Sequence, residues 1–237
     1  MEVDCDIGNA KQDEAANAAS HEAGGHALQT PSYADQSYWD ARYEKEHVLN
    51  NFEWYGDFAS LAAPLCDTEG PLGECALQPP ALVLEIGCGD SALAMRLATQ
   101  GFVVVAVDFS APALWRLRSI HSQHDGASSV EARCDLLLGD VRRLPFASGS
   151  FDVVLDKGCF DALRHHDSED MLAEVCRMLR EGGRFLCLSN NESLLRSHAR
   201  KIENWAKFLR APALVQTEDD EVYLHCYRRL SAAEQRP

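Results

Sequence analysis

The chain has 237 residues, 46% of them hydrophobic, a length and composition typical of one folded domain with additional segments. Its 37 acidic residues outnumber 22 lysines and arginines, which gives a formal net charge of −15. This charge repels phosphate backbones and argues against nucleic acid as a partner. No apolar run reaches the roughly 20 residues that a membrane helix needs, so no membrane association is expected.

The first 36 residues differ in composition from the rest of the chain. They hold seven acidic residues against one cation, Lys11, and show no periodic apolar face. Such a segment cannot bury enough surface to offset its ordering entropy, so residues 1–36 are expected to form a disordered acidic tail. The tail lacks the features of a transit or signal peptide, which favours a cytoplasmic location. Nine cysteines without a Cys-x-x-Cys pair fit free thiols in a reducing compartment.

From residue 81 the sequence alternates between strands and helices. Apolar or β-branched runs predict strands at 81–86, 102–107, 130–138, 151–155 and 184–188. Apolar periodicity and capping residues predict helices at 91–100, from Ser110, from Asp167 or Ser168 to Gly182-Gly183, and around 194–209. Two more strands, 213–217 and 222–227, are close enough in sequence to pair antiparallel. The pattern predicts an α/β fold with a parallel sheet and helices on both faces.

The central motif joins the first predicted strand to the next helix and reads Leu84-Glu85-Ile86-Gly87-Cys88-Gly89-Asp90-Ser91. Glycines at such a turn let the backbone approach a ligand closely. Nineteen residues after Gly89, Asp108 ends the second strand, where a carboxylate can accept both hydroxyls of a ribose. An ordinary tight turn is the weaker alternative, because it does not explain the spacing to Asp108.

The glycine pattern alone also fits a dinucleotide site, and three features argue against a nicotinamide cofactor. Glu85 precedes the glycines where a nicotinamide site usually keeps an apolar residue. Asp140 lies at the tip of the third strand, where it suits an adenine amino group. The closing antiparallel hairpin is typical of a methyltransferase sheet.

Together these residues resemble the class I S-adenosylmethionine-dependent methyltransferases over residues 37–230. Glu85–Ser91 matches the glycine-rich motif, Asp108 the ribose acid, and Asp140-Val141 the adenine motif. Ser91 departs from the commonest pattern, which has a third glycine, and suits one subgroup. The resemblance implies a Rossmann-like, doubly wound, seven-stranded sheet that is mostly parallel with an antiparallel C-terminal strand. It also implies S-adenosyl-L-methionine as the cofactor.

The segment before the first strand is similar to that of the small lysine methyltransferases acting on elongation factor 1-alpha, and of their citrate synthase-modifying relative. The shared residues are Tyr38-Trp39-Asp40-x-Arg42-Tyr43, Phe52–Phe58, Asp156-Lys157-Gly158 and Asp161-Ala162-Leu163. The resemblance implies a methyltransferase domain at 37–237, with a lid segment at 37–80 and a core at 81–230. It implies cofactor contacts from Trp39, Tyr43, Trp54, Glu85, Gly87, Cys88, Gly89, Asp108, Phe109, Asp140, Val141 and Lys157. Packing in the core is the alternative for the aromatic residues.

The remaining polar residues are assigned on weaker signals. Asp156 ends a strand at the carboxyl edge, where it could orient a substrate amine or cap the next loop. Residues 189–192 follow the fifth strand at the same edge and could line the acceptor site. His165-His166-Asp167 could supply metal ligands, but a solvated helix start is the simpler interpretation, so no metal is expected.

Three functions remain open on the sequence alone. The first is protein-lysine methyl transfer by a monomer, with a protein partner that carries an accessible lysine, such as a translation elongation factor. The second is methylation of a small molecule at the same cofactor site, and the third is a non-catalytic nucleotide-binding module. Because Glu85, Gly87, Gly89, Asp108 and Asp140 are all present, the third is the least favoured.

Overall fold

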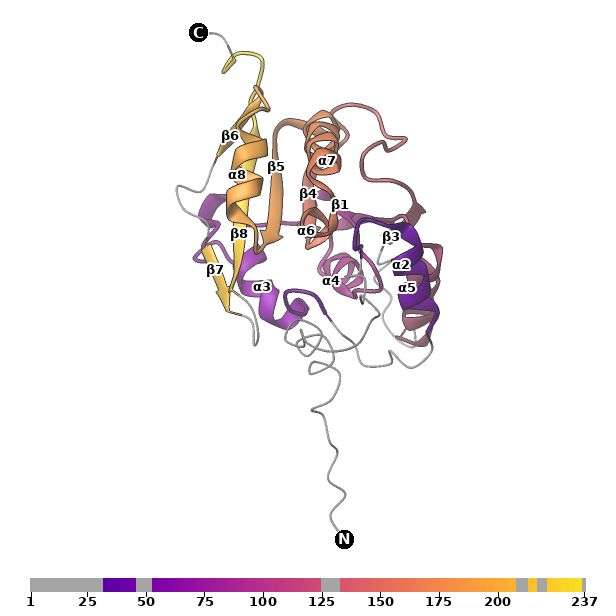
Figure 1. The fold of residues 1–237 in the computed structure, drawn as a ribbon. Coiled ribbons are helices and arrows are strands. Elements are labelled where there is room, and N and C mark those ends of the chain that lie inside the picture. The colour runs from indigo at the N-terminus through magenta and orange to yellow at the C-terminus, as the bar shows by residue number, and fades with distance from the viewer. Residues whose placement is uncertain (1–31, 46–52, 125–132, 208–212, 217–220, 236–237) are drawn as a thin grey trace. The chain divides into compact units, whose positions relative to one another are not determined.

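The computed structural model in Figure 1 describes residues 32–45, 53–124, 133–207, 213–216 and 221–235. All of them belong to one unit of the chain that begins at Ser32. The disordered tail was predicted at residues 1–36. Residues 1–31 lie outside the described residues, and their disorder stays a prediction, whereas residues 32–36 are described and Gln36 is the first residue of a helix. Within the described part of the chain, no helix combines the length and the apolar character needed to cross a membrane.

The centre of the fold is a mixed sheet in the order β3-β2-β1-β4-β5-β8-β6, with β7 also paired to β8 (Figure 1). Its strands are β1 Leu82–Ile86, β2 Val103–Asp108, β3 Arg133–Leu138, β4 Phe151–Lys157, β5 Leu179–Ser189, β6 Trp205–Lys207, β7 Ala213–Gln216 and β8 Glu221–Arg229. The first five are parallel and β8 is antiparallel to β5. Because β6 and β7 pair with successive parts of one edge of β8, they share the seventh position of the sheet. The predicted seven-position, mostly parallel sheet is confirmed.

Helices cover both faces of the sheet. They are α2 Gln36–Glu44, α3 Phe58–Cys66, the 3₁₀ turn η1 Gly73–Cys75, α4 Leu93–Thr99, α5 Ala111–His124, α6 Cys159–Ala162, α7 His165–Met178 and α8 Glu192–Ala199. Along β4, Val153 and Leu155 join the core beneath α3, α4 and α5, while Val154 joins the core beneath α7 and α8. This alternation follows from the two-residue period of a strand. Because both faces are covered, the strands must be apolar on both sides, as their sequences are.

Two predicted helix ends are wrong. The helix expected around 194–209 ends at Ala199, and Trp205–Lys207 forms β6. Trp205 is buried and its ring stacks on those of Phe185 and Tyr227, with centroids 5.4 and 5.3 Å away, so tertiary packing fixes this segment as a strand.

The second correction concerns Gly182-Gly183, which was expected to end a helix. α7 ends at Met178, and the two glycines lie inside β5, where the register against β4 shifts. Gly182 has φ +75°, and a Cβ on Gly183 would lie 2.9 Å from the carbonyl oxygen of Arg180. The glycine pair therefore permits a bulge in the strand.

The segment before β1 has two structurally different parts. Leu61 and Leu65 of α3 are fully buried in the first core, as are Leu72 and Leu77. By contrast, α2 has no buried residue. The part of the predicted lid segment from α3 onward thus belongs to the core. The part of the segment that lies at the carboxyl edge of the sheet is α2 together with the short stretch 53–55.

Candidate functional site

A cavity of about 280 Å³ lies at the carboxyl ends of the parallel strands. The turn after β1 and the ends of β2 and β4 form its floor, and residues from α2 and from 53–55 also line it. Eleven of the twelve predicted cofactor-binding residues line the cavity: Trp39, Tyr43, Trp54, Gly87, Cys88, Gly89, Asp108, Phe109, Asp140, Val141 and Lys157. The twelfth, Glu85, is not part of the lining.

The two glycines of the turn after β1 are required by geometry. Gly87 has φ +60° and Gly89 has φ +55°, which other residues rarely adopt. A Cβ on Gly87 would lie 2.5 Å from the Cβ of Cys159, and one on Gly89 would lie 2.5 Å from the hydroxyl oxygen of Tyr43. A side chain at Gly87 would therefore overlap with Cys159, and one at Gly89 would have to displace the Tyr43 hydroxyl.

Asp108 joins the glycine turn to the end of β2. Its Oδ2 accepts a hydrogen bond from the Gly89 N–H and its Oδ1 accepts one from the Ser110 N–H, both at 2.8 Å. Burial raises the pKa of Asp108 to about 6, although these backbone N–H groups favour the charged form. Each carboxylate oxygen can accept more than one hydrogen bond, so Asp108 retains capacity for a ligand.

Asp140, the predicted adenine-binding residue, is paired with a cation in this structure. The Arg142 side chain donates to both of its carboxylate oxygens, and Arg142 also contacts Asp167 at 2.6 Å. This pairing lowers the pKa of Asp140. Arg142 lines the cavity beside Asp140 and was not predicted from the sequence.

Lys157 holds the segment 53–54 against the sheet. Its Nζ donates to Glu53 Oε2 and to the carbonyl oxygen of Trp54, both at 2.8 Å. The other carboxylate oxygen of Glu53 accepts from the Ala92 N–H at 3.2 Å, just before α4. Lys157 therefore positions the wall of the cavity, and Glu53, which the sequence analysis did not identify, is its partner.

The predicted aromatic residues form a half-buried cluster over the cavity. The ring of Trp39 stacks on Tyr43 with centroids 5.9 Å apart, and it meets the ring of Trp54 edge-on at 6.2 Å. Trp39 Nε1 donates to the carbonyl oxygen of Tyr33 at 2.6 Å, which adds a residue that was expected to lie in the tail. We call Tyr33, Trp39, Tyr43 and Trp54 the aromatic cover. Since none of the four is fully buried, the geometry favours a cavity wall over a core.

Two hydrogen bonds attach α2 to the loop that follows β2. Ser110 Oγ donates to Asp40 Oδ1 at 2.7 Å, and Gln36 Nε2 donates to the carbonyl oxygen of Phe109 at 2.8 Å.

Asp161 is the main residue of the opposite wall. Its Oδ2 accepts from the Tyr55 hydroxyl at 2.8 Å and from the Asn190 N–H at 3.2 Å, and its Oδ1 accepts from the Ser189 hydroxyl at 2.6 Å. Burial raises its pKa. Asn190 lies in the 189–192 stretch that was predicted to line the acceptor site, and both Asp161 and Asn190 line the cavity. The sequence signal for Asp161 was its place in the Asp161-Ala162-Leu163 motif, to which no role was assigned.

Two predicted acids do not reach the cavity. Asp156 is fully buried and accepts hydrogen bonds from the N–H groups of Cys159 and Phe160, so the geometry supports the capping interpretation over substrate orientation. Glu85 is also buried, and neither of its carboxylate oxygens has a hydrogen-bond partner among the described residues. Burial raises the pKa of each to about 8.

Comparison with known proteins identifies the class of this fold. Residues 83–183 match the family described as a methyltransferase domain. The chain is 34% identical over 190 residues to EEF1A lysine methyltransferase 4 of Mus musculus, covering 73% of this chain and 69% of that protein. It is 30% identical over 165 residues to the Homo sapiens eEF1A lysine and N-terminal methyltransferase, covering 66% of this chain but 22% of that protein.

Among solved structures, the magnesium protoporphyrin IX methyltransferase of Synechocystis PCC 6803 with bound SAM has a similar fold. Its TM-score is 0.60 at 14% identity, and the match covers 84% of this chain and 100% of that one. At this identity the likeness concerns the fold alone.

Proposed function

The chain belongs to the family of S-adenosylmethionine-dependent methyltransferases that includes the eEF1A lysine methyltransferases, and from this premise we propose that it methylates a lysine of an eEF1A-type elongation factor. The observation that carries the proposal is a single cavity with two chemically different walls. One wall is the glycine turn with Asp108, and the other holds the hydrogen-bonded carboxylate of Asp161. The aromatic cover lines the same cavity.

The first wall fits S-adenosylmethionine. Gly87 and Gly89 present backbone without side chains, so a ligand can approach closely, and Asp108 offers unused acceptor capacity for hydroxyl groups. Asp140 and Val141 at the end of the next strand would contact the adenine. When bound, this cofactor supplies an electrophilic methyl group.

Asp161 is suited to bind the acceptor amine. Three donors, from Tyr55, Ser189 and Asn190, fix its carboxylate in one orientation. A carboxylate held in this way can attract a lysine ammonium and orient it. Its raised pKa also makes it a stronger base than an exposed aspartate, so it can accept the proton that the amine must lose.

The aromatic cover favours the neutral amine. A free lysine has a pKa of about 10.4, so most of it is protonated at neutral pH and has no lone pair for the transfer. Enclosure between the rings of Trp39 and Trp54 excludes water, and desolvation lowers the pKa of an amine. The cover therefore raises the fraction of the lysine amine that is neutral and reactive. Because the two walls have fixed positions, bringing this amine and the cofactor's methyl group together costs less entropy.

Three further properties belong to this proposal. The chain is proposed to act as a monomer, and to do so in the cytoplasm because translation elongation takes place there. The net charge of −15 favours a basic protein surface over nucleic acid as the partner. These properties are tested by sedimentation, by localisation of the tagged full chain, and by binding assays.

The direct test is incubation of the full chain with radiolabelled S-adenosylmethionine, once with purified eEF1A and once with cell lysate, followed by gel analysis and mass spectrometry. We expect label on one lysine of eEF1A. Label in small molecules only would instead support the small-molecule alternative. Cofactor binding without any transfer would support the non-catalytic module.

A pair of aspartate variants tests the role of Asp161. Asp161→Asn should lower the rate of transfer at least tenfold and leave the affinity for S-adenosylhomocysteine unchanged. The control is Asp152→Asn, because Asp152 also accepts a backbone hydrogen bond, from the Leu82 N–H, but does not line the cavity. Equal rates for the two variants would remove Asp161 from the acceptor site.

A further inference from the structure

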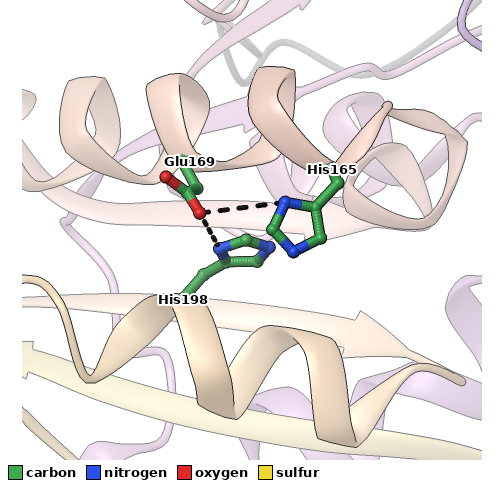
Figure 2. A group of neighbouring side chains, drawn as sticks. All are labelled: His165, Glu169 and His198. Carbon is green, nitrogen blue, oxygen red and sulfur yellow. Dashed lines mark ion pairs between the residues drawn. The ribbon is translucent and has the colours of Figure 1, made fainter.

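Three side chains of metal-binding type meet between α7 and α8, outside the cavity (Figure 2). His165 and Glu169 lie one turn apart on the same face of α7, and His198 reaches them from α8. One donor atom from each residue lies within 4.8 Å of the others. Glu169 Oε1 is 2.9 Å from His198 Nδ1 and 3.8 Å from His165 Nδ1.

His198 is the fixed member of this group. Its side chain is 1% exposed, its Nδ1 faces Glu169 Oε1, and its Nε2 has no hydrogen-bond partner among the described residues. A buried polar atom without a partner is costly, and this imidazole is directed at two other donor groups. His165 and Glu169 are 66% and 38% exposed, so both can adjust toward a common ligand without disturbing the core.

We propose that His165, Glu169 and His198 form a zinc-binding site. Zinc binds imidazole nitrogen and carboxylate oxygen at about 2.0–2.2 Å, so the donor atoms of a tetrahedral site lie about 3.4 Å apart. The two separations from Glu169 Oε1, 2.9 and 3.8 Å, lie on either side of this value. Rotation of the exposed His165 side chain can adjust the separation between the donor nitrogens of His165 and His198. Two histidines and one glutamate leave the fourth position to water on the exposed side.

The site would join two helices that cover the same face of the sheet. Leu172 and Val175 of α7 and Leu195 of α8 pack in the same core, and zinc would link the two helices at their polar margin. This use of His165 departs from the expectation that the His165-His166-Asp167 start of the helix is only solvated. The sequence could not show it, because His198 is remote in the chain.

Lys201 competes with a metal for the carboxylate. Its Nζ lies 2.5 Å from Glu169 Oε1, and its side chain is 55% exposed. An exposed ion pair of this kind contributes little to stability, so the ammonium can move away when zinc binds. Removal of this charge should therefore strengthen zinc binding.

The test is calorimetric titration of the chelator-treated full chain with zinc chloride. We expect one equivalent to bind at this site, with affinity at least tenfold lower in His165→Ala and in Glu169→Gln. Both positions are partly exposed, so these variants should fold. Lys201→Gln should bind more tightly than the unsubstituted chain.

His166→Ala is the matched control, because His166 is the exposed neighbour of His165 and is not a member of the group. It should bind zinc as the unsubstituted chain does. Titration with cobalt should give a spectrum without the charge-transfer band of a thiolate ligand. Unchanged binding in His165→Ala, a thiolate band, or no binding at all would overturn the proposal and leave the group as an ion-pair cluster.

Discussion

Replacement of Gly87 by alanine should add both backbone strain and steric overlap to the turn after β1. At φ +60° an L-residue costs about 1–2 kcal/mol. The added Cβ would also lie 2.5 Å from the Cβ and 2.6 Å from the Sγ of Cys159, and overpacking of this kind costs about 1–3 kcal/mol more. Gly87→Ala should therefore lower the free energy of unfolding by about 2–5 kcal/mol and weaken binding of S-adenosylhomocysteine.

Gly73→Ala provides the matched control for this prediction. Gly73 has φ +52°, and a Cβ there would have no heavy atom within 4 Å, so the variant experiences the backbone strain alone. Urea denaturation should show a loss of about 1–2 kcal/mol, and titration calorimetry should show unchanged ligand affinity. If the two variants lose the same free energy of unfolding, the close approach of Gly87 to Cys159 is not a constraint on the fold.

Three further outcomes are expected. Asp108→Ala should reduce the affinity for S-adenosylhomocysteine at least tenfold in calorimetry, since charge-assisted hydrogen bonds contribute roughly 1.5–3 kcal/mol each. Unchanged affinity in a folded variant would exclude Asp108 as a contact. Burial raises the pKa of Glu85 from 4.5 to about 8, so the folded chain holds a proton that the unfolded chain releases, and stability should fall as the pH rises between these values. Denaturation at several pH values should show a smaller fall for Glu85→Gln. Trp39→Ala should weaken cofactor binding with little change in melting temperature, whereas a core tryptophan would lose about 3–5 kcal/mol.

The buried parallel strands could be predicted from the sequence because each has its own local signal. Val103–Asp108 is rich in β-branched valine, and it is β2 in the structure. Trp205–Lys207 has no such signal, since three residues show no period and the preceding segment is helical. Its conformation depends on partners from other strands, namely backbone pairing with β8 and the rings of Phe185 and Tyr227.

In the site, too, residues with a local sequence signal were predictable and residues fixed by distant partners were not. The glycine turn and Asp108 were predictable, because residues at the carboxyl ends of neighbouring parallel strands must lie at one edge. Glu53 and Asp161 were not assigned a role, because their partners lie far away in the sequence: Glu53 and Lys157 are 104 residues apart, and Tyr55 and Asp161 are 106 apart. Pairings over such distances follow from the fold and leave no periodic pattern.

The two parts of the wall above the cavity differ in how firmly they are attached. The stretch 53–55 is held by the buried Lys157 ammonium, by the Tyr55–Asp161 hydrogen bond, and by close contact between Tyr55 and Gly158, whose added Cβ would lie 3.2 Å from the ring. α2 has no buried residue, and two hydrogen bonds join it to the loop after β2. The bond from Gln36 is exposed and exchanges readily with water, and the bond from the buried Ser110 hydroxyl ends on the half-buried Asp40. Separation of α2 therefore costs less free energy than separation of 53–55. Exchange of a ligand at the glycine turn should then proceed through displacement of α2, with Trp54 and the Asp161 wall remaining in place.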